Sequence, residues 1–470
     1  MEPSRTPPDS QPSSRLVGPW LCAGLAFGCV APREAVDPEG AIARATAIED
    51  AVVLRVEGLP VDERGSAPER LTLAEALRQA LRSSPDLQSA LARVRLAEAE
   101  ADQARLLPNP VLDLVLRSPS GGGHAEIDAG IAQDLLSVLT RPRRSRATDD
   151  RLARSAAEAL AVALDLVAEV RLRYAAAQAL EEELSLLRER RALVARLVEV
   201  ARARLEQGEG SRLDATSIEA QALELDLEMQ GRAANRRAER LALARLVGRP
   251  SADPEWALEP WSDVPEIPVS EADWVHRALA ARPEIQAARW ELAARLEEAG
   301  LAGAGVWEGL GTGADLELRD DESLGPALSL PIPIFDRGSE RRARARAAIL
   351  EARHELVTVQ REAVEQVRLA LVELETAQER LALVRDRLLP LALDRRRQVE
   401  VVYLGGAVDV TALLLAEQDL QEAQLRRVEL EQDLANALTR LERATGGNAV
   451  REERPRGERD SNEESAETEE

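Results

Sequence analysis

The sequence is short of several residue types, and each shortage limits what the protein can be. It has 470 residues and no lysine, so all 61 basic residues are arginines, and aromatic residues make up only 2%. Alanine, leucine, arginine and glutamate dominate, which is typical of long helices and coiled coils. The formal net charge of −23 argues against a nucleic-acid partner, because the chain would repel the phosphate backbone.

Groups for catalysis or metal binding are also scarce. No cysteine follows Cys29, so the rest of the chain has neither a disulfide framework nor a thiolate metal site. The three histidines, His124, His276 and His354, are far apart and lack the spacing of a zinc site or a nucleophile–base pair. Carboxylate pairs are abundant, but in helices they are usually solvated or paired with arginine four residues away. We therefore expect no enzyme, no metal and no cofactor.

A short apolar run near the N-terminus predicts an export signal. Residues 16–27 are mostly apolar and follow Arg15. The run is shorter than the ~20 residues that a transmembrane helix needs, and it fits the core of a signal peptide. Ala26 and Gly28 precede Cys29 as in a bacterial lipobox, in which Cys29 would be acylated and become the first residue of the mature protein. The alternative is ordinary signal cleavage, with Cys29 an incidental apolar residue.

The chain contains one long pattern twice. Residues 80–88 return as 278–286, and in each copy a β-like stretch and a long heptad-patterned segment follow. The repeat is far too long for a solenoid, so it indicates a duplicated module of strands and coiled coil. The predicted divisions are a signal peptide at 1–28, an N-terminal linker at 29–68, a first repeat at 69–250, a linker at 251–270, a second repeat at 271–447 and a disordered acidic tail at 448–470.

Each module is expected to contain a β-hairpin. A helix that begins at Pro85 should end near residue 106, and the period then changes from helical to two. The predicted strands are 111–117 and 126–133 in the first module, and 314–319 and 327–335 in the second. Two hairpins in one chain cannot close a barrel, so other copies of the chain must complete the sheet.

After each hairpin a long helix is expected. Apolar residues three and four positions apart run through 143–206 and 338–404, which is the pattern of a coiled coil. Each segment ends at a glycine-containing break, at 207–210 and at 405–406. A returning antiparallel helix should follow each break.

These features resemble the TolC-like outer membrane efflux protein family over about residues 69–447. The residues that carry the resemblance are 71–77, 107–110 and 208–214, and 328–338 is similar to the heavy-metal-resistance branch of the family. The resemblance implies a mainly α fold with a small β part. Three copies, each with four strands, would form one outer-membrane β-barrel that continues as a long periplasmic α-helical coiled-coil barrel.

The resemblance also implies a docking site at the helix breaks. In the family these turns form the periplasmic tip, where an adaptor protein binds. The matching residues here are Gly208, Arg212 and Leu213 in the first module, with Gly405 and Val408 in the second.

A pore constriction is implied at the same end. Asp409 matches an acidic position that lines the pore in family members, although it could equally be a helix N-cap. The family often has an arginine just before this acid, and that arginine is missing here. Tyr403 is then the nearest candidate to lock against Asp214.

The implied function is a passive exit duct in a tripartite efflux system. A homotrimer in outer-membrane lipid would conduct metal ions or small toxic compounds from an inner-membrane pump and its periplasmic adaptor to the exterior. The alternatives are a periplasmic coiled-coil scaffold without a pore, or the exit duct of a protein secretion system. The alternating strands favour a duct. The scarcity of aromatic residues near them, beyond Trp307 and Phe335, counts against it, because membrane barrels usually carry aromatic girdles.

Overall fold

The computed structural model describes residues 36–48, 52–62, 69–117, 126–208, 211–261, 270–318, 322–404, 407–408 and 410–447. These residues lie within one compact unit, Val36–Glu470. The predicted signal peptide, Cys29 and the acidic tail fall outside the described residues. No helix in the described ranges combines the length and the apolar character that a membrane-crossing helix requires.

The fold repeats itself, as the sequence pattern predicts. The first half contains α2 (Leu73–Ser83), α3 (Pro85–Arg105), β2 (Val111–Arg117), β3 (Glu126–Asp134), α4 (Leu135–Glu206) and α5 (Arg212–Leu246). The second contains α6 (Glu271–Ala281), α7 (Pro283–Ala302), the short 3₁₀ helix η1 (Ala304–Trp307), β5 (Gly311–Leu318), β6 (Glu322–Ser329), α8 (Ser339–Leu383), a π turn (Val384–Leu388), α9 (Leu389–Leu404) and α10 (Val410–Ala444). Helices α5 and α10 have 35 residues each.

Local signals set the helix starts in both halves. Thr72 caps α2 by accepting a hydrogen bond from the backbone N–H of Glu75 at 3.1 Å, and Ser270 caps α6 in the same way. Pro85 and Pro283 occupy the first positions of α3 and α7, where the missing N–H costs no hydrogen bond. The predicted starts of these helices are confirmed.

Helix α4 begins earlier than expected. It has 72 residues, a length of about 108 Å at 1.5 Å per residue. It starts at Leu135, capped by Asp134, rather than at residue 143, and it contains Pro142. The proline removes one backbone hydrogen bond. The packing of α4 against α3, α5, α7 and α10 outweighs this local cost, because tertiary contacts supply most of the stability of helices in proteins.

The matching helix of the second half is not continuous. The expected helix over 338–404 is divided by the π turn Val384–Leu388, which comes directly before Pro390. Pro390 has no N–H to bond to the carbonyl four residues earlier, so the regular ladder cannot pass through this point. The heptad pattern crosses the interruption unchanged, and therefore gave no sign of it.

The four long strands form one antiparallel sheet in the order β2-β3-β5-β6. Strands β2 and β3 match the prediction closely, but β6 ends at Ser329, whereas the predicted strand ran to residue 335. Pro331 and Pro333 have no N–H for a ladder, so the segment 330–335 leaves the sheet. The strand prediction was wrong for these six positions.

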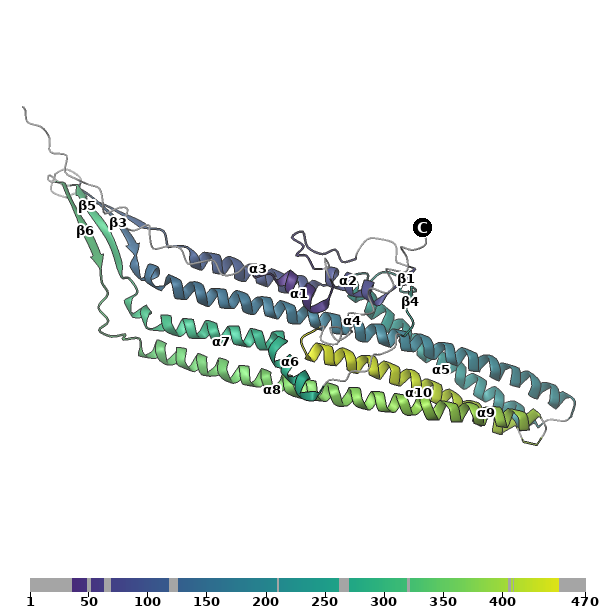
Figure 1. Ribbon diagram of the computed structural model, residues 1–470. Helices are drawn as coiled ribbons and strands as arrows, with labels where there is room; N and C mark the ends of the chain where they lie inside the picture. Colours follow the sequence, from purple (N-terminus) through teal and green to yellow (C-terminus); the bar gives the residue numbers. More distant parts are fainter. Residues whose placement is uncertain are drawn as a thin grey trace, which may run out of the picture. The chain divides into compact units, whose positions relative to one another are not determined.

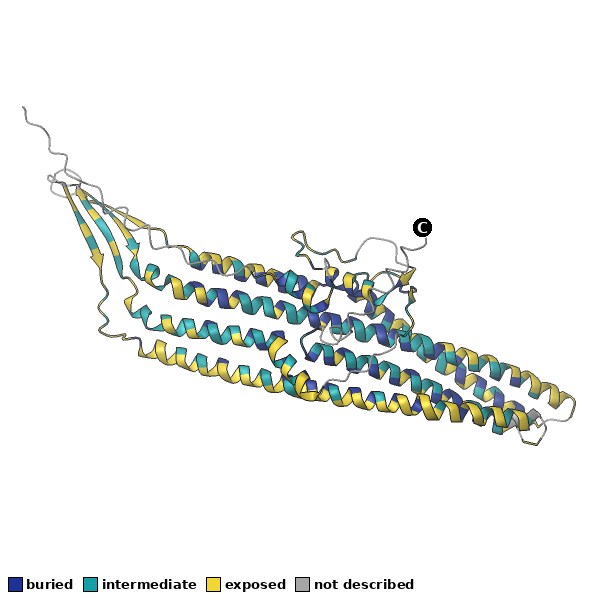
Figure 2. Ribbon diagram, in the orientation of Figure 1, coloured by how far each residue is buried: buried dark blue, intermediate teal, exposed yellow. Residues whose placement is uncertain are grey.

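Helices from both halves pack side by side. Helix α4 contacts α3, α5, α7 and α10, and α8 contacts α6, α7 and α10 (Figure 1). Figure 2 shows buried residues along the helix contacts, whereas most of α8 and much of the sheet is exposed. Large apolar side chains are among the exposed ones on α8: Leu350, Val357, Leu369, Val372 and Leu383.

Two short elements were not anticipated. Helix α1 (Pro38–Thr46) lies in the predicted N-terminal linker and packs on α4. Strand β1 (Arg70–Leu71) pairs in parallel with β4 (Ala257–Leu258), which lies in the linker between the repeats. Tyr174 of α4 holds this pair, since its hydroxyl donates to the Leu71 carbonyl at 2.8 Å and accepts from the Glu259 N–H at 2.9 Å.

Candidate functional sites: the sheet and the hairpin tips

The sheet has two chemically different faces. Residues paired across an antiparallel ladder share a face, so the register Leu112↔Ile131 and Leu114↔Ala129 continues through Ala129↔Leu316 and Leu316↔Leu324. This face is apolar, and its leucines and isoleucines are exposed or half-buried: Leu112, Leu114, Leu116, Ile127, Ile131, Leu316, Leu324 and Leu328.

The opposite face is acidic. The pairs Asp113↔Gly130 and Gly130↔Asp315 place two carboxylates on either side of one glycine. Asp128 and Glu317 are paired one rung further along. The face also carries Arg117, which forms an ion pair with Asp128 at 3.3 Å. Negative charge therefore predominates on this side of the sheet.

Glycines allow this close packing of strands and carboxylates. A side-chain Cβ at Gly130 would lie 2.6 Å from Oδ1 of Asp315, and one at Gly313 would lie 2.1 Å from the Ile131 carbonyl oxygen. Both separations are well inside van der Waals contact. A side chain at Gly313 would therefore push the strands apart, because its neighbours are backbone atoms, whereas one at Gly130 would displace the Asp315 carboxylate.

The first hairpin tip joins α4 to α5 and is well capped. Gly208 follows the end of α4 with a φ of +76°, a left-handed conformation that favours glycine. Ser211 caps α5 by accepting a hydrogen bond from the Leu213 N–H at 3.1 Å. Arg212 and Leu213 are exposed, Leu213 by 72%. The structure therefore brings the three predicted docking residues of this tip together on an accessible turn.

The second tip is described only in part. Val408 is exposed at 37%, whereas Gly405 and Asp409 fall outside the described residues. Tyr403 is half-buried, and the guanidinium of Arg204 lies 5.8 Å from the centre of its ring, within the range of a cation–π contact. The side chain of Asp214 is not among those described, so the expected lock between Tyr403 and Asp214 stays a prediction.

A hydrophobic cluster holds the two hairpins together just behind the tips. Leu187, Val194 and Leu197 of α4 pack with Ile218, Ala222 and Leu225 of α5 and with Leu413 of α10. Tyr403 borders this cluster. The contact between Arg204 and Tyr403 joins α4 to α9 at the same place. Sequence reasoning did not find it, because nothing in either segment pairs two residues so far apart in the chain.

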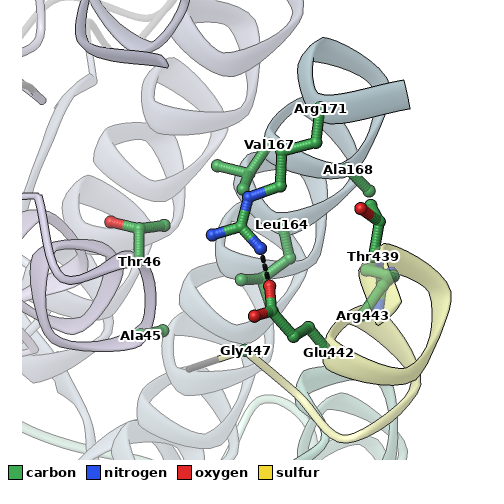
Figure 3. Close-up of a pocket in the computed structure, with 10 residues that line it drawn as sticks. All are labelled: Ala45, Thr46, Leu164, Val167, Ala168, Arg171, Thr439, Glu442, Arg443 and Gly447. Atoms are coloured by element: carbon green, nitrogen blue, oxygen red, sulfur yellow. Dashed lines mark ion pairs between the residues drawn. The ribbon is translucent and has the colours of Figure 1, made fainter. Parts of the chain in front are cut away.

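A second charged cluster lies where the two halves meet, away from both tips. Arg171 of α4 pairs with Glu442 of α10 (Figure 3). Arg443 pairs with Asp165 at 2.6 Å and with Glu284 of α7. Burial alone would raise the pKa of Glu284, but the hydrogen bond and charge of Arg443, aided by Arg282, outweigh burial and lower it.

This cluster is not a ligand site. The cavity that it borders holds only about 20 Å³, room for roughly one water molecule. Nor do His, Cys, Asp and Glu side chains in the described parts of the chain gather in threes as a metal site would require. The arrangement is one of ion pairs that link α4, α7 and α10, and its role is structural.

Comparison with solved structures places the fold among bacterial channels. The chain aligns with VceC of Vibrio cholerae over 80% of its own length and 96% of that protein, with a TM-score of 0.67 and 22% identity. It aligns with the open MtrE channel of Neisseria gonorrhoeae over 83% of its own length and 95% of MtrE, with a TM-score of 0.66 and 19% identity. It aligns with the CmeC channel of Campylobacter jejuni over 80% of its own length and 85% of CmeC, with a TM-score of 0.68 and 15% identity.

Sequence comparisons agree. A curated protein, the outer membrane efflux protein BepC of Brucella suis, is 28% identical over 262 residues, 53% of this chain and 56% of BepC. The chain thus matches this relative over about half its length. The model of the family described as outer membrane efflux protein matches residues 76–249 and 274–447, one match in each half of the duplicated fold. The chain therefore belongs to the outer membrane efflux protein family.

Proposed function

We propose that this protein is the outer-membrane exit duct of a tripartite efflux system and conducts its cargo passively. The observation that carries the proposal is the two-faced sheet with open edges. An apolar face suits lipid and an acidic face suits a water-filled lumen. The family is one of channels, so the expectation of a non-enzymatic protein is confirmed.

The open edges support a homotrimer. Among the described residues, strands β2 and β6 each have only one neighbouring strand, and an unpaired edge is not tolerated in lipid, where no water can satisfy its backbone groups. Three copies would close the sheet. The exposed apolar side chains of α8, such as Leu369 and Val372, give a second reason for partner copies. Apolar side chains that gather on a surface often mark a contact with another protein chain.

The tips suit an adaptor, and an adaptor implies an inner-membrane pump that supplies the energy. Docking would use Gly208, Arg212 and Leu213 with Gly405 and Val408. The similarity of 328–338 to the heavy-metal-resistance branch favours metal ions or small toxic compounds as cargo. A scaffold without a pore has no use for an apolar sheet face, and nothing described favours a secretion duct.

Two further roles belong to this proposal. Asp409 would line the narrowest part of the pore, once per protomer, with Asp214 and Tyr403 contributing to closure. Cys29 would carry a lipid anchor, which mass spectrometry of the mature N-terminus would detect. The lipid would then anchor the protein to the outer membrane in addition to the barrel.

The channel proposal is tested with protein purified from outer membranes. Mass measurement in detergent should give three protomers, and planar bilayers should show discrete conductance steps. Leu316→Arg, on the apolar face, should prevent assembly, because an arginine facing lipid costs about 2–4 kcal/mol near the midplane. Asp315→Asn, its neighbour on the acidic face, is the matched control and should assemble. A stable monomer, or trimers that never conduct, would contradict the proposal.

A further inference from the structure

Two arginine-rich segments of this acidic chain follow the strands β3 and β6. Residues 135–148, at the start of α4, contain Arg141, Arg143, Arg144 and Arg146 and no acidic residue. Residues 337–350, at the start of α8, contain Arg337, Arg341, Arg342, Arg344 and Arg346 with the single acid Glu340. We call these nine side chains the arginine belt.

Both halves of the belt follow a strand and then an exposed apolar stretch. After β3, the first turn of α4 presents Leu139, which is 65% exposed. After β6, the segment 330–335 presents Ile332 at 77% and Phe335 at 98% exposure, with Leu330 and Ile334 also exposed. The order of strand, apolar stretch and arginines therefore occurs independently in each half of the duplicated fold.

Contacts place the two halves of the belt beside the same segment. Arg341 donates a hydrogen bond to the Gly305 carbonyl at 2.8 Å, and Arg143 lies so close to Gly300 that a side chain there would collide with its guanidinium. Gly300 and Gly305 lie in α7 and η1, just before β5. The belt therefore lies next to the end of the sheet, below the strand ends that lead into α4 and α8 (Figure 1).

Several of these charges are available to a ligand. Arg337, Arg342, Arg344 and Arg346 are exposed, and in the described parts of the chain no carboxylate forms an ion pair with them. By contrast, Arg341 is held by Asp336 and Arg146 lies 3.7 Å from Glu297. A protein with a net charge of −23 thus carries a locally positive zone next to its sheet.

We propose that the arginine belt binds the anionic headgroups of phospholipids in the periplasmic-side leaflet of the outer membrane. This inference rests on the proposed function, which places the apolar sheet face in lipid. Strand β5 has 8 residues, about 26 Å when extended and nearer 20 Å in height when tilted as in a barrel. That is less than the ~25 Å apolar band of outer-membrane barrels.

The apolar stretches make up the missing height. Leu139, Ile332 and Phe335 extend the apolar band beyond the strand ends, and the arginines come next, at the level of the headgroups. Trp307 of η1 is 42% exposed nearby, and tryptophan favours this interface. Guanidinium groups bind phosphate oxygens in pairs, so arginine suits a phosphodiester headgroup well.

The test compares two variants with the same change in charge. The belt variant carries Arg337→Gln, Arg342→Gln, Arg344→Gln and Arg346→Gln. The control variant carries Arg353→Gln, Arg361→Gln, Arg387→Gln and Arg397→Gln, which are exposed positions further along α8, the π turn and α9. Full-length trimers are exposed to phosphatidylglycerol and phosphatidylethanolamine in equal amounts, and native mass spectrometry counts the lipids that each trimer retains.

The wild type and the control should retain phosphatidylglycerol preferentially, and the belt variant should lose at least about tenfold of that preference, since each of the four surface arginines contributes a several-fold factor. An unchanged preference in the belt variant, or none in the wild type, would overturn the inference. Retention of lipid A as strong as that of phosphatidylglycerol would also overturn it, because lipid A belongs to the other leaflet. Conductance of the same samples tests the channel separately, because a conducting trimer without lipid preference would refute only the belt.

Discussion

Arg443 shows how single residues join the two halves of this protein. Its side chain is only 16% exposed and pairs with Asp165 of α4 and Glu284 of α7, while the residue itself belongs to α10. Burial alone would lower the pKa of Arg443, but the hydrogen bonds that its guanidinium donates to the carboxylates of Asp165 and Glu284, together with their charges, more than compensate and raise it. The guanidinium therefore stays charged and holds helices from both repeats.

We predict that Glu284→Gln destabilises the protein in a pH-dependent way. Because the pKa of Glu284 is lowered in the folded protein, its ionised carboxylate stabilises the fold fully at pH values above its ordinary pKa of 4.5. This stabilisation is lost as the pH falls below 4.5 and through the lowered pKa. The variant should be less stable by about 1–3 kcal/mol at pH 7, below the usual cost of breaking a fully buried pair because the side chain is partly exposed. The midpoint of thermal trimer dissociation, measured at pH 7 and pH 4, checks this.

The control for this variant is Glu373→Gln. Glu373 pairs with Arg440 at 2.7 Å, but both side chains are about half exposed, and exposed pairs contribute roughly 0–1 kcal/mol. Its midpoint should stay close to that of the wild type at both pH values. If Glu284→Gln cost the same stability at pH 4 as at pH 7, the ion pair would not be the source of the effect.

At the level of elements, the first hairpin tip can carry a larger side chain without a clash inside the protein. Gly208 has a positive φ, yet the space around its Cα is open, since apart from its chain neighbours no atom of the described residues lies within 4 Å of where a side chain would begin. A larger residue there costs only the backbone strain, about 1–2 kcal/mol. A change of function in such a variant would therefore report on what approaches the tip from outside.

We predict that Gly208→Trp reduces efflux while the trimer reaches the outer membrane at normal levels. The bulk of the indole should obstruct an adaptor that docks on Arg212 and Leu213. Gly231→Trp places the same side chain on α5, in open space and at an ordinary φ, and serves as the control. Drug or metal resistance in cells, set against the amount of trimer, gives the readout. Normal resistance of Gly208→Trp would place docking elsewhere.

The sequence predicts elements best where one residue determines the conformation of the few residues next to it. Thr72 and Pro85 mark helix starts because capping and proline geometry act within one turn. Pro142 misleads for the same reason: it signals a helix break, but α4 continues through it because other helices, among them α3 and α7, pack on α4. The short pair of β1 and β4 depends on Tyr174, which is distant from both in sequence, so no local pattern reveals it.

The candidate sites follow the same rule. The glycine at 208 identifies the first tip from the sequence, and the structure gives it a left-handed conformation. The acidic face of the sheet can be predicted in part from the sequence, because Asp113 and Asp128 alternate with apolar neighbours. Their alignment with Asp315 cannot, because it depends on the register between the two repeats. The contact of Arg204 with Tyr403 depends on how the two hairpins pack.

For the whole molecule, a closed sheet and the tips would give the duct two acidic zones. One is the sheet face with Asp113, Asp128, Asp315 and Glu317, and the other is the ring of three Asp409 side chains that the proposed trimer implies. The two zones differ in width. Charges on a wide barrel wall lie further from the axis than the Debye length of about 8 Å at physiological salt, whereas charges at a constriction do not.

We predict that Asp409, rather than the sheet, sets the ion preference of the channel. A narrow passage with low-dielectric walls focuses the field of its carboxylates, so the wild type should prefer cations. Asp409→Asn should lower the ratio of potassium to chloride permeability several-fold in single-channel recordings, with trimer stability unchanged. Asp315→Asn removes the same charge from the sheet and should leave that ratio nearly as it was. The reverse result would move the selective part of the duct to the barrel and leave Asp409 as a helix cap.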